Sequence, residues 1–211
     1  MLIPLQYLID KYHPKFKGVI HVGAHYAEEH DDYVKAGITT FIYYEPCKGA
    51  WRKLVDIFAD KKNIWMCNFA VGATEGEVEM NTASFNKGES NSILKPLLHL
   101  QQHPEVIFDG TEKALMVTLD NHINKPFLID NGINLLVMDV QGYEGEVLKG
   151  ATETLKHIDY VYTEVNRGQT YADNMEIEGI DELLKDFQRV ETKWAGNTTW
   201  GDAFYIRKTL L

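Results

Sequence analysis

The chain has 211 residues, which is enough for one domain with a sizeable apolar core. Its composition, 45% hydrophobic and 25% charged, is that of a globular protein and excludes disordered, collagen-like and low-complexity chains. With 31 acidic and 21 basic side chains the net charge is −10, and no cluster of Lys or Arg interrupts it, so we expect neither a nucleic acid nor a membrane as a partner.

The sequence carries no sign of export. Cys47 and Cys67 are too few for a disulfide framework and lie in no metal-binding spacing, which favours a reducing compartment. The apolar start of the chain lacks the basic region and cleavage site of a signal peptide, and no apolar run reaches the length of a membrane span. We therefore expect a cytoplasmic protein, whose oligomeric state stays open.

Helices and strands are predicted to alternate along the first third of the chain. The apolar runs and helical stripes give the order helix Leu5–Tyr12, strand Gly18–Val22, helix Glu28–Lys35, strand Thr40–Tyr44, a helix over Trp51–Phe58 and strand Asn63–Phe69.

The middle of the chain breaks this alternation. Glu77–Asn81 is predicted to be a strand with no helix partner, and Ala83–Gly110 is a long stretch rich in Ser, Asn and Gly, with a helix expected near Leu94–Leu100. Irregular segments of this length in a compact domain are usually functional. We interpret residues 83–110 as a lid or substrate loop inserted in a single domain that comprises residues 1–211.

The rest of the chain returns to alternation and ends in a hairpin. Its predicted elements are strand Ala114–Leu119, strand Leu135–Met138, helix Glu146–Leu155, strand Tyr160–Thr163, helix Ile180–Phe187 and the hairpin Val190–Trp194 with Ala203–Arg207. Near-continuous apolar strands between helices indicate an α/β fold, a doubly wound sheet that is mostly parallel, and the hairpin adds an antiparallel edge strand.

The residues that end the predicted strands indicate where a ligand binds. They are Gly23, Glu45, Asn68, Asp139 and Glu164, and four of the five are polar. In doubly wound sheets ligands bind at the carboxyl ends of the strands, where the strand order reverses. We therefore expect these side chains to face one crevice.

The loop after the first strand argues against a dinucleotide. Of a GxGxxG pattern only Gly23 is present, and the next helix opens with Glu28, Glu29, Asp31 and Asp32, which would repel a pyrophosphate. S-adenosylmethionine, which has a positive centre and no phosphate, fits better.

Glu45 supports the same cofactor. It follows Gly23 by 22 residues, and a carboxylate about 20 residues past the glycine loop is the usual acceptor for two ribose hydroxyls. Asn68, Phe69 and Ala70, at the end of the third strand, are then expected beside the adenine.

The chain resembles the FkbM-type S-adenosylmethionine-dependent methyltransferases over about two-thirds of its length. The matching pieces are Val22-Gly23-Ala24-His25, Tyr44-Glu45, Asn68–Gly72, Ser90–Leu94, Thr118-Leu119-Asp120, Asp139–Glu144, Val147–Ala151 and Glu164. The resemblance implies a class I methyltransferase fold, which is Rossmann-like, and O-methyl transfer. Three positions depart from the family's pattern: His21 replaces an acidic residue, Ala27 a second loop glycine, and Gln141 a Glu.

These observations together give an S-adenosylmethionine-dependent O-methyltransferase that acts on a hydroxyl of a small molecule or glycan. The predicted cofactor-binding residues are Gly23, Ala24, His25, Glu45, Asn68, Phe69, Ala70 and Gln141. Because the methyl group is already activated, the protein has to align the hydroxyl and remove its proton. Asp139 and Glu164 are the predicted catalytic residues, with His25 as a second candidate base.

Other interpretations stay open. Asp139, Glu164 and Asn166 are oxygen ligands that could hold a divalent cation, although the resemblance requires no metal. A dinucleotide-dependent oxidoreductase on the same sheet and a non-catalytic cofactor-binding homologue are the alternative functions. Trp200 and the other tryptophans are expected to pack in the core or hairpin, and His99 and His103 to lie on a solvated helix face.

Overall fold

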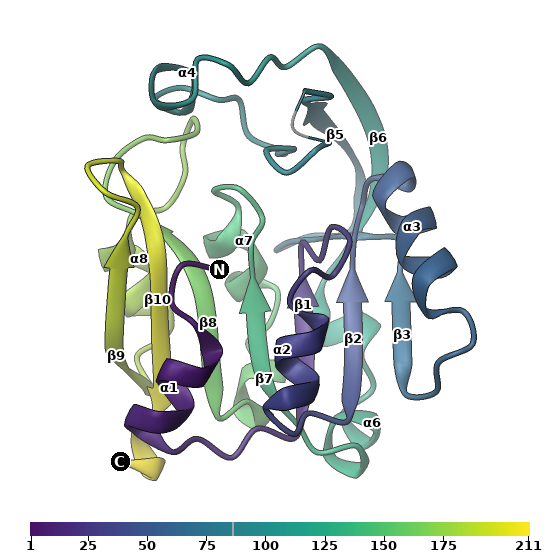
Figure 1. The fold of residues 1–211 in the computed structure, drawn as a ribbon, viewed down its shortest axis with the longest axis vertical. Coiled ribbons are helices and arrows are strands. Elements are labelled where there is room, and N and C mark those ends of the chain that lie inside the picture. Colours follow the sequence, from purple (N-terminus) through teal and green to yellow (C-terminus); the bar gives the residue numbers. More distant parts are fainter. Residues whose placement is uncertain (86) are drawn as a thin grey trace.

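The computed structural model describes residues 1–85 and 87–211, and this part of the chain is built around a seven-stranded sheet (Figure 1). The strands lie in the order β3 (Ile64–Cys67), β2 (Thr40–Tyr44), β1 (Gly18–Val22), β7 (Ile133–Met138), β8 (Tyr160–Asn166), β10 (Trp200–Arg207) and β9 (Phe187–Trp194). The first five strands are parallel, whereas β10 runs antiparallel to β8 and β9. The predicted doubly wound α/β sheet with an antiparallel hairpin at one edge is confirmed.

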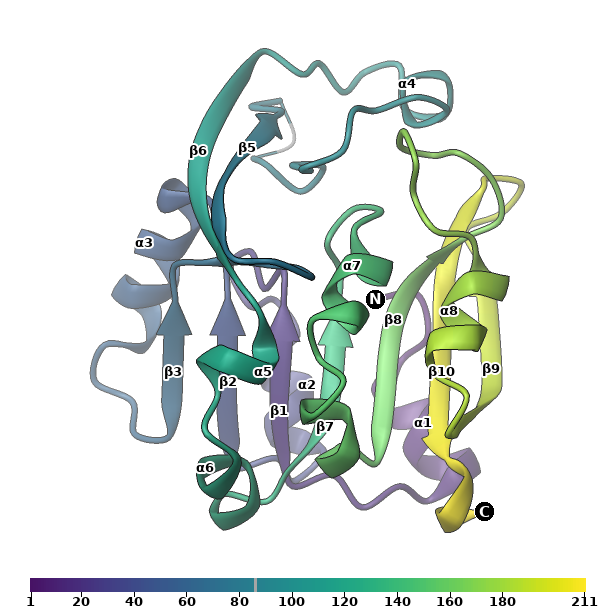
Figure 2. The same ribbon diagram turned by 180° about the vertical axis from the view of Figure 1, so that it is seen from behind.

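Helices cover both faces of this sheet, and for that reason the central strands are apolar at nearly every position. One face carries α1 (Leu5–Tyr12), α2 (His30–Lys35) and α3 (Lys48–Phe58), as Figure 1 shows. The other carries α5 (Leu119–His122), α6 (Lys125–Asp130), α7 (Glu144–Lys149) and α8 (Ile177–Leu183), as Figure 2 shows. Every residue of β1, β2, β7 and β8 is buried.

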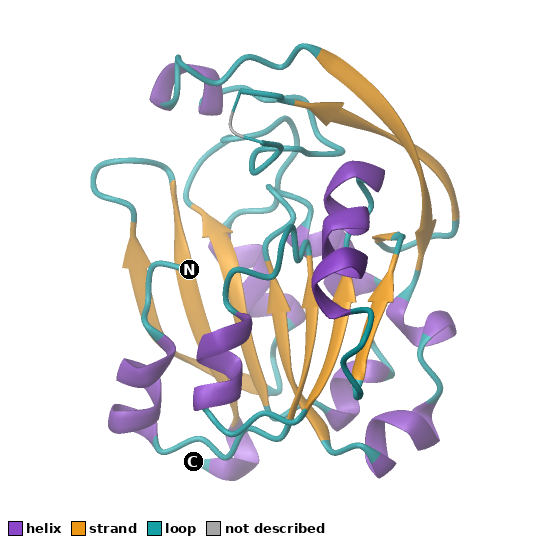
Figure 3. Ribbon diagram, turned by 45° about the vertical axis from the view of Figure 1, so that its right-hand side comes forward, coloured by secondary structure: helices purple, strands orange, loops and turns teal. Residues whose placement is uncertain are grey.

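A second, smaller sheet stands over the carboxyl ends of the parallel strands. It has the order β4 (Ala70–Val71), β6 (Gly110–Val117), β5 (Gly76–Thr82), and the segment between β5 and β6 carries the short helix α4 (His99–Gln102) (Figures 1 and 3). An apolar cluster joins this sheet to the domain and consists of Cys47, Ala50, Ala70, Met80, Ala114 and Met116. The strand expected near Glu77–Asn81 is thus β5, and its partner is β6 rather than the main sheet.

Several predicted boundaries are wrong, mostly at helix ends. The helix expected over Leu94–Leu100 is α4, which begins only at His99; the helix over Glu146–Leu155 is α7 followed by the separate 3₁₀ turn η1 (Thr154–His157). Strand β8 continues to Asn166, so Glu164 lies inside it instead of at its end. A further 3₁₀ turn, η2 (Lys208–Leu210), follows β10, and Asn86 of the predicted loop lies outside the described residues. None of the helices in the described part of the chain is long and apolar enough to cross a membrane.

The strand order reverses between β1 and β7, and Gly23 allows the loops after these two strands to touch. Its φ is +79°, and a Cβ atom there would lie 1.8 Å from the carbonyl oxygen of Asp139. The amide of Asp139 donates to the carbonyl of Val22 (3.0 Å), and the amides of Gly23 and Ala24 both donate to the carbonyl of Tyr44. Three strand ends are thereby held together at the point where a ligand is expected.

Replacing Gly23 by alanine should test this contact. We expect Gly23→Ala to lower the free energy of unfolding by roughly 1–2 kcal/mol for the left-handed backbone and by about 1–3 kcal/mol more for the overlap with Asp139. Gly37→Ala is the matched control, because Gly37 has a φ of +83° but open space where its Cβ would be. Urea unfolding of the two variants should separate the backbone contribution from the contribution of the overlap with Asp139. Equal losses of unfolding free energy in the two variants would contradict the close approach of Gly23 to Asp139.

Candidate active site

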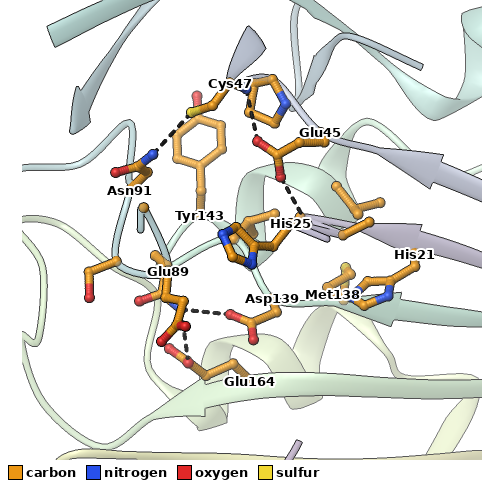
Figure 4. Close-up of a pocket in the computed structure, with 18 of the residues that line it drawn as sticks. His21, His25, Glu45, Cys47, Glu89, Asn91, Met138, Asp139, Tyr143 and Glu164 are labelled. Atoms are coloured by element: carbon orange, nitrogen blue, oxygen red, sulfur yellow. Dashed lines mark hydrogen bonds between the residues drawn. The ribbon is translucent and has the colours of Figure 1, made fainter. Parts of the chain in front are cut away.

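A cavity of about 550 Å³ lies between the carboxyl ends of the parallel strands and the smaller sheet. Its floor comes from the loops after β1, β2 and β7 and from β8, and the segment between β5 and β6 closes it from above. Figure 4 shows the side chains of this floor, with Glu45 in the upper part of the view and Asp139 and Glu164 in the lower part. The volume is in the range of small-molecule and cofactor sites.

Glu45 is fixed at the end of β2 by two backbone amides. His25 N donates to its Oε2 (2.9 Å) and Cys47 N donates to its Oε1 (2.8 Å), so each carboxylate oxygen keeps a free lone pair. The side chain is buried, and this burial raises the pKa of Glu45 to about 7 despite the two amides. It lines the cavity, as the spacing from Gly23 predicted.

Asn68 takes a different position from the one expected. It is not among the described residues that line the cavity; its Nδ2 donates to the carbonyls of Glu45 and Pro46, both at 2.9 Å. Asn68 therefore holds the turn that carries Glu45. The two residues that follow it, Phe69 and Ala70, do line the cavity and form an apolar wall together with Val71.

His25 lies in the loop after β1 with both ring nitrogens engaged. Nδ1 contacts Glu28 Oε1 (2.7 Å), Nε2 contacts the carbonyl of Lys87 (3.1 Å), and the ring stacks on Tyr26 with 3.7 Å between centroids. Burial lowers the pKa of His25, but these two contacts outweigh it, so the net pKa is raised. Lys87 belongs to the segment above the cavity, so His25 joins that segment to the floor.

Asp139 and Glu164 meet at the other side of the floor through one amide. Gln141 Nε2 donates to Asp139 Oδ1 (2.6 Å) and to Glu164 Oε2 (3.4 Å), and its Oε1 accepts from Tyr171 Oη (2.7 Å). The backbone carbonyl of Gln141 accepts from Ser92 Oγ (2.7 Å). Gln141, whose φ is +54°, thus orients both predicted catalytic carboxylates, and an amide suits this role because it can donate where a Glu could not.

The two carboxylates differ in their surroundings. Asp139 is exposed to the cavity, and desolvation by the protein that surrounds the cavity raises its pKa to about 6. Glu164 is buried, and desolvation followed by the charges of Asp139, Glu144 and Asp202 raises its pKa well above the usual range. The two carboxylates therefore titrate as a pair, and each makes ionisation of the other less favourable.

Glu144 fixes the loop that carries Asp139, a role that the sequence did not indicate. Its Oε1 accepts the amides of Val140 (3.1 Å) and Gly142 (3.3 Å). In the sequence it was set apart only as the last residue of the Asp139–Glu144 motif. Burial raises the pKa of Glu144 to about 7.

Other unpredicted residues of the cavity come from segments distant in sequence. Tyr171 follows β8, Asp202 lies in β10, and Asn91 donates from its Nδ2 to Cys47 Sγ (3.2 Å). Trp200 belongs to the hairpin, as expected, but also lines the cavity, and His99 is buried rather than solvated. Loop residues of this kind carry no periodic signal, so only the three-dimensional structure brings them together.

The structure shows the surroundings of two residues that depart from the pattern of the family that the chain resembles. Ala27 has a φ of +54°, a conformation that glycine adopts more easily. His21 is buried in β1 and bonded to Tyr33 Oη (3.1 Å), and burial lowers its pKa, which keeps it neutral. Among the described residues, no group of three His, Cys, Asp or Glu side chains is arranged to hold a metal ion, and Asn166 does not line the cavity.

The raised pKa of Glu144 leads to a pH-dependent prediction. Because the folded chain holds a proton that the unfolded chain releases, the stability contributed by the protonated form is present below pH 4.5 and is lost as the pH rises to about 7. Glu144→Gln keeps an oxygen for both amides and cannot ionise. It should match the wild type at pH 4 and exceed it at pH 8 by on the order of 1–3 kcal/mol.

Urea unfolding at the two pH values measures this difference. Glu182→Gln is the matched control, since Glu182 is exposed on α8 and should leave the pH dependence unchanged. A Glu144→Gln chain that loses stability at both pH values would mean that the ionised carboxylate, not its neutral form, holds the loop.

Comparison with known proteins agrees with this geometry. The profile of the FkbM methyltransferase domain matches residues 21–190. The 2-O-methyltransferase NoeI of Sinorhizobium fredii is 35% identical over 101 residues, a match that covers 48% of this chain and 41% of that protein. The chain thus spans less than half the length of this relative.

Two solved structures share the fold. The magnesium protoporphyrin IX methyltransferase ChlM of Synechocystis PCC 6803 superimposes with a TM-score of 0.52 at 7% identity, covering 96% of this chain and 76% of that one. A protein of the NADB-Rossmann superfamily from Streptococcus agalactiae gives 0.53 at 11% identity, covering 98% and 68%. The domain match extends over four-fifths of the sequence, and the chain belongs to the FkbM family of S-adenosylmethionine-dependent methyltransferases.

Proposed function

We propose that this protein transfers a methyl group from S-adenosylmethionine to a hydroxyl of a small molecule or glycan. The observation that carries the proposal is the Asp139 carboxylate, which lies where the strand order reverses, opens into the cavity and is oriented by Gln141. The relative NoeI is by its name a 2-O-methyltransferase, which favours oxygen as the methyl acceptor.

The cofactor would bind between Glu45 and the loop Gly23–His25. Glu45 is suited to the two ribose hydroxyls because each of its oxygens has a lone pair left after accepting one amide. Phe69 and Ala70 give an apolar wall for the adenine, and Asn68 supports the Glu45 turn from behind. When bound, S-adenosylmethionine supplies an activated methyl group on a positively charged sulfur.

Asp139 is the best candidate for the group that orients the acceptor hydroxyl and takes its proton. Its pKa of about 6 leaves it mostly ionised at neutral pH, as a group that accepts a proton must be. His25 is less suited to act as the base because both of its ring nitrogens already have partners in the protein. Gln141, itself predicted as a cofactor contact, positions Asp139 and Glu164.

Residues 83–110 would serve as a cover for the substrates. Segments from this stretch line the upper side of the cavity, and three contacts attach them to the floor: Lys87 to His25, Asn91 to Cys47, and Ser92 to Gln141. A cover of this kind excludes water from the reacting groups and lets substrates enter when it opens.

Asp139→Asn should show whether Asp139 acts as the general base or as a ligand of the cofactor. We expect turnover to fall by roughly 100-fold or more, with the affinity for S-adenosylhomocysteine little changed. In the wild type, kcat/KM should rise with pH through about 6, since only the ionised carboxylate accepts a proton. A collapse of cofactor binding in the variant would make Asp139 a cofactor ligand, and activity that EDTA abolishes and Mg²⁺ restores would favour a metal site.

Glu45→Ala should test the cofactor site by calorimetry. The variant is expected to lose about 1.5–3 kcal/mol of S-adenosylhomocysteine binding, the range for hydrogen bonds to a charged group. Glu77→Ala, an exposed residue of β5 outside the cavity, is the control. Tighter binding of NAD than of S-adenosylhomocysteine by the wild type would support an oxidoreductase instead, and cofactor binding without any methyl transfer a non-catalytic homologue.

A further inference from the structure

The end of the cavity away from Glu45 has its own chemistry, which the proposed reaction does not use. Four rings that line it form a row: Tyr171, His99, His103 and Trp200. Their centroids are 5.3 Å apart for Tyr171 and His99, 5.1 Å for His99 and His103, and 6.4 Å for His103 and Trp200. Trp200 Nε1 also donates to His103 Nε2 (3.3 Å), which fixes the orientation of both rings.

His99, in the middle of this row, has one ring nitrogen without a hydrogen-bond partner among the described residues. Its side chain is 5% exposed and its Nε2 contacts Ser90 Oγ (3.1 Å), but its Nδ1 has no partner among the described residues. Burial, and then the charge of His103, lower the pKa of His99 to about 4, so the ring is neutral. A buried polar atom without a partner is unfavourable unless a ligand or water satisfies it.

The Asp, Glu, Lys and Arg side chains among the described residues that line the cavity are all acidic, and the N-terminal ammonium group of Met1, which also lines it, is paired with Glu29 (3.4 Å). The acidic residues that line it are Glu28, Glu29, Glu45, Glu89, Glu105, Asp139, Glu164 and Asp202, and no Lys or Arg is among the described residues that line it. A phosphate or carboxylate entering this cavity would lose its water shell and find no Lys or Arg side chain in exchange among the described residues that line it. Hydroxyl groups, in contrast, can donate to carboxylates, and the apolar face of a ring can pack on the aromatic row.

We propose that this end of the cavity is the acceptor subsite and that it binds a sugar ring that carries no negative charge. The inference rests on the proposed function. One face of the sugar ring lies against Trp200 and His103. One sugar hydroxyl pairs with His99 Nδ1 or with one of the carboxylates that line the cavity. Another hydroxyl faces Asp139, which is the group placed to accept its proton.

A panel of matched acceptors tests the charge rule, that is, the inference that the subsite accepts neutral sugars and rejects anionic ones. Methyl glycosides of glucose, galactose and mannose are compared with their uronates and 6-phosphates, first for binding to the chain loaded with S-adenosylhomocysteine and then for methyl transfer. We expect at least one neutral member to bind and react, and its charged counterparts to show kcat/KM at least about 10-fold lower. Anionic members that react equally well or better, or a failure of every neutral member to bind, overturn the inference.

Variants identify the residues responsible. Trp200→Ala should raise KM for the neutral sugar about 10-fold without changing S-adenosylhomocysteine affinity, and Trp200→Phe should restore most of the loss. Trp65→Ala is the control, because Trp65 is 38% exposed in β3 and lies outside the cavity. An unchanged KM in folded Trp200→Ala overturns the assignment of the aromatic row.

Glu105→Gln keeps the test independent of folding, since the Glu105 side chain is 55% exposed and forms an ion pair with His103 alone among the described residues. It should bring the uronates closer to the neutral sugars in kcat/KM, and an unchanged ratio counts against the charge rule. Wild-type protein that does not bind S-adenosylhomocysteine would instead refute the proposed function, so the two failures are distinguishable.

Discussion

The contact between Gly23 and the carbonyl of Asp139 is the constraint on which the rest of the site depends. Where the strand order reverses, the connections after β1 and β7 leave toward opposite faces of the sheet, and a side chain on Gly23 would hold the loops after these two strands apart. With only hydrogen on the α-carbon, the loop after β1 bonds to the end of β2 and reaches the loop after β7. Glu45 and Asp139, from opposite sides of this point, therefore face a single cavity.

Burying several carboxylates beside one another requires compensation, and the structure supplies it in two forms. Backbone amides donate to both oxygens of Glu45 and twice to Oε1 of Glu144. The side-chain amide of Gln141 lies between Asp139 and Glu164 and donates to both. These acids are thus oriented by neutral donors, and no Lys or Arg is among the described residues that line the cavity.

The sequence predicted the sheet better than it predicted the site. Strands β1 and β2 were predicted at their observed bounds, because apolar runs buried on both faces end abruptly at Gly23 and Glu45. Helix ends were less accurate: α7 ends at Lys149 before the C-cap Gly150, a stop signal that the predicted helix Glu146–Leu155 ran through, and α4 is only four residues long.

Within the site, strand-end position identified Glu45 and Asp139 but could not give the direction of a side chain. Asn68 points to the Glu45 turn instead of the cavity, and Glu164 lies within its strand. Tyr171, His99 and Trp200 reach the cavity from a loop, a four-residue helix and a hairpin that are distant in sequence. Contacts of this kind depend on how segments fold over the sheet, which local patterns do not encode.

The raised pKa values of Glu45 and Asp139 in the floor of the cavity, and of Glu144, which fixes the loop that carries Asp139, mean that this region holds and releases protons near neutral pH. The formal charge of −10 counts all three groups as ionised, and the folded chain therefore carries less negative charge than its composition indicates. A positively charged ligand in the cavity stabilises the ionised carboxylates and expels protons into the solvent. The heat released on binding such a ligand then includes the protonation of the buffer, and its apparent affinity increases with pH.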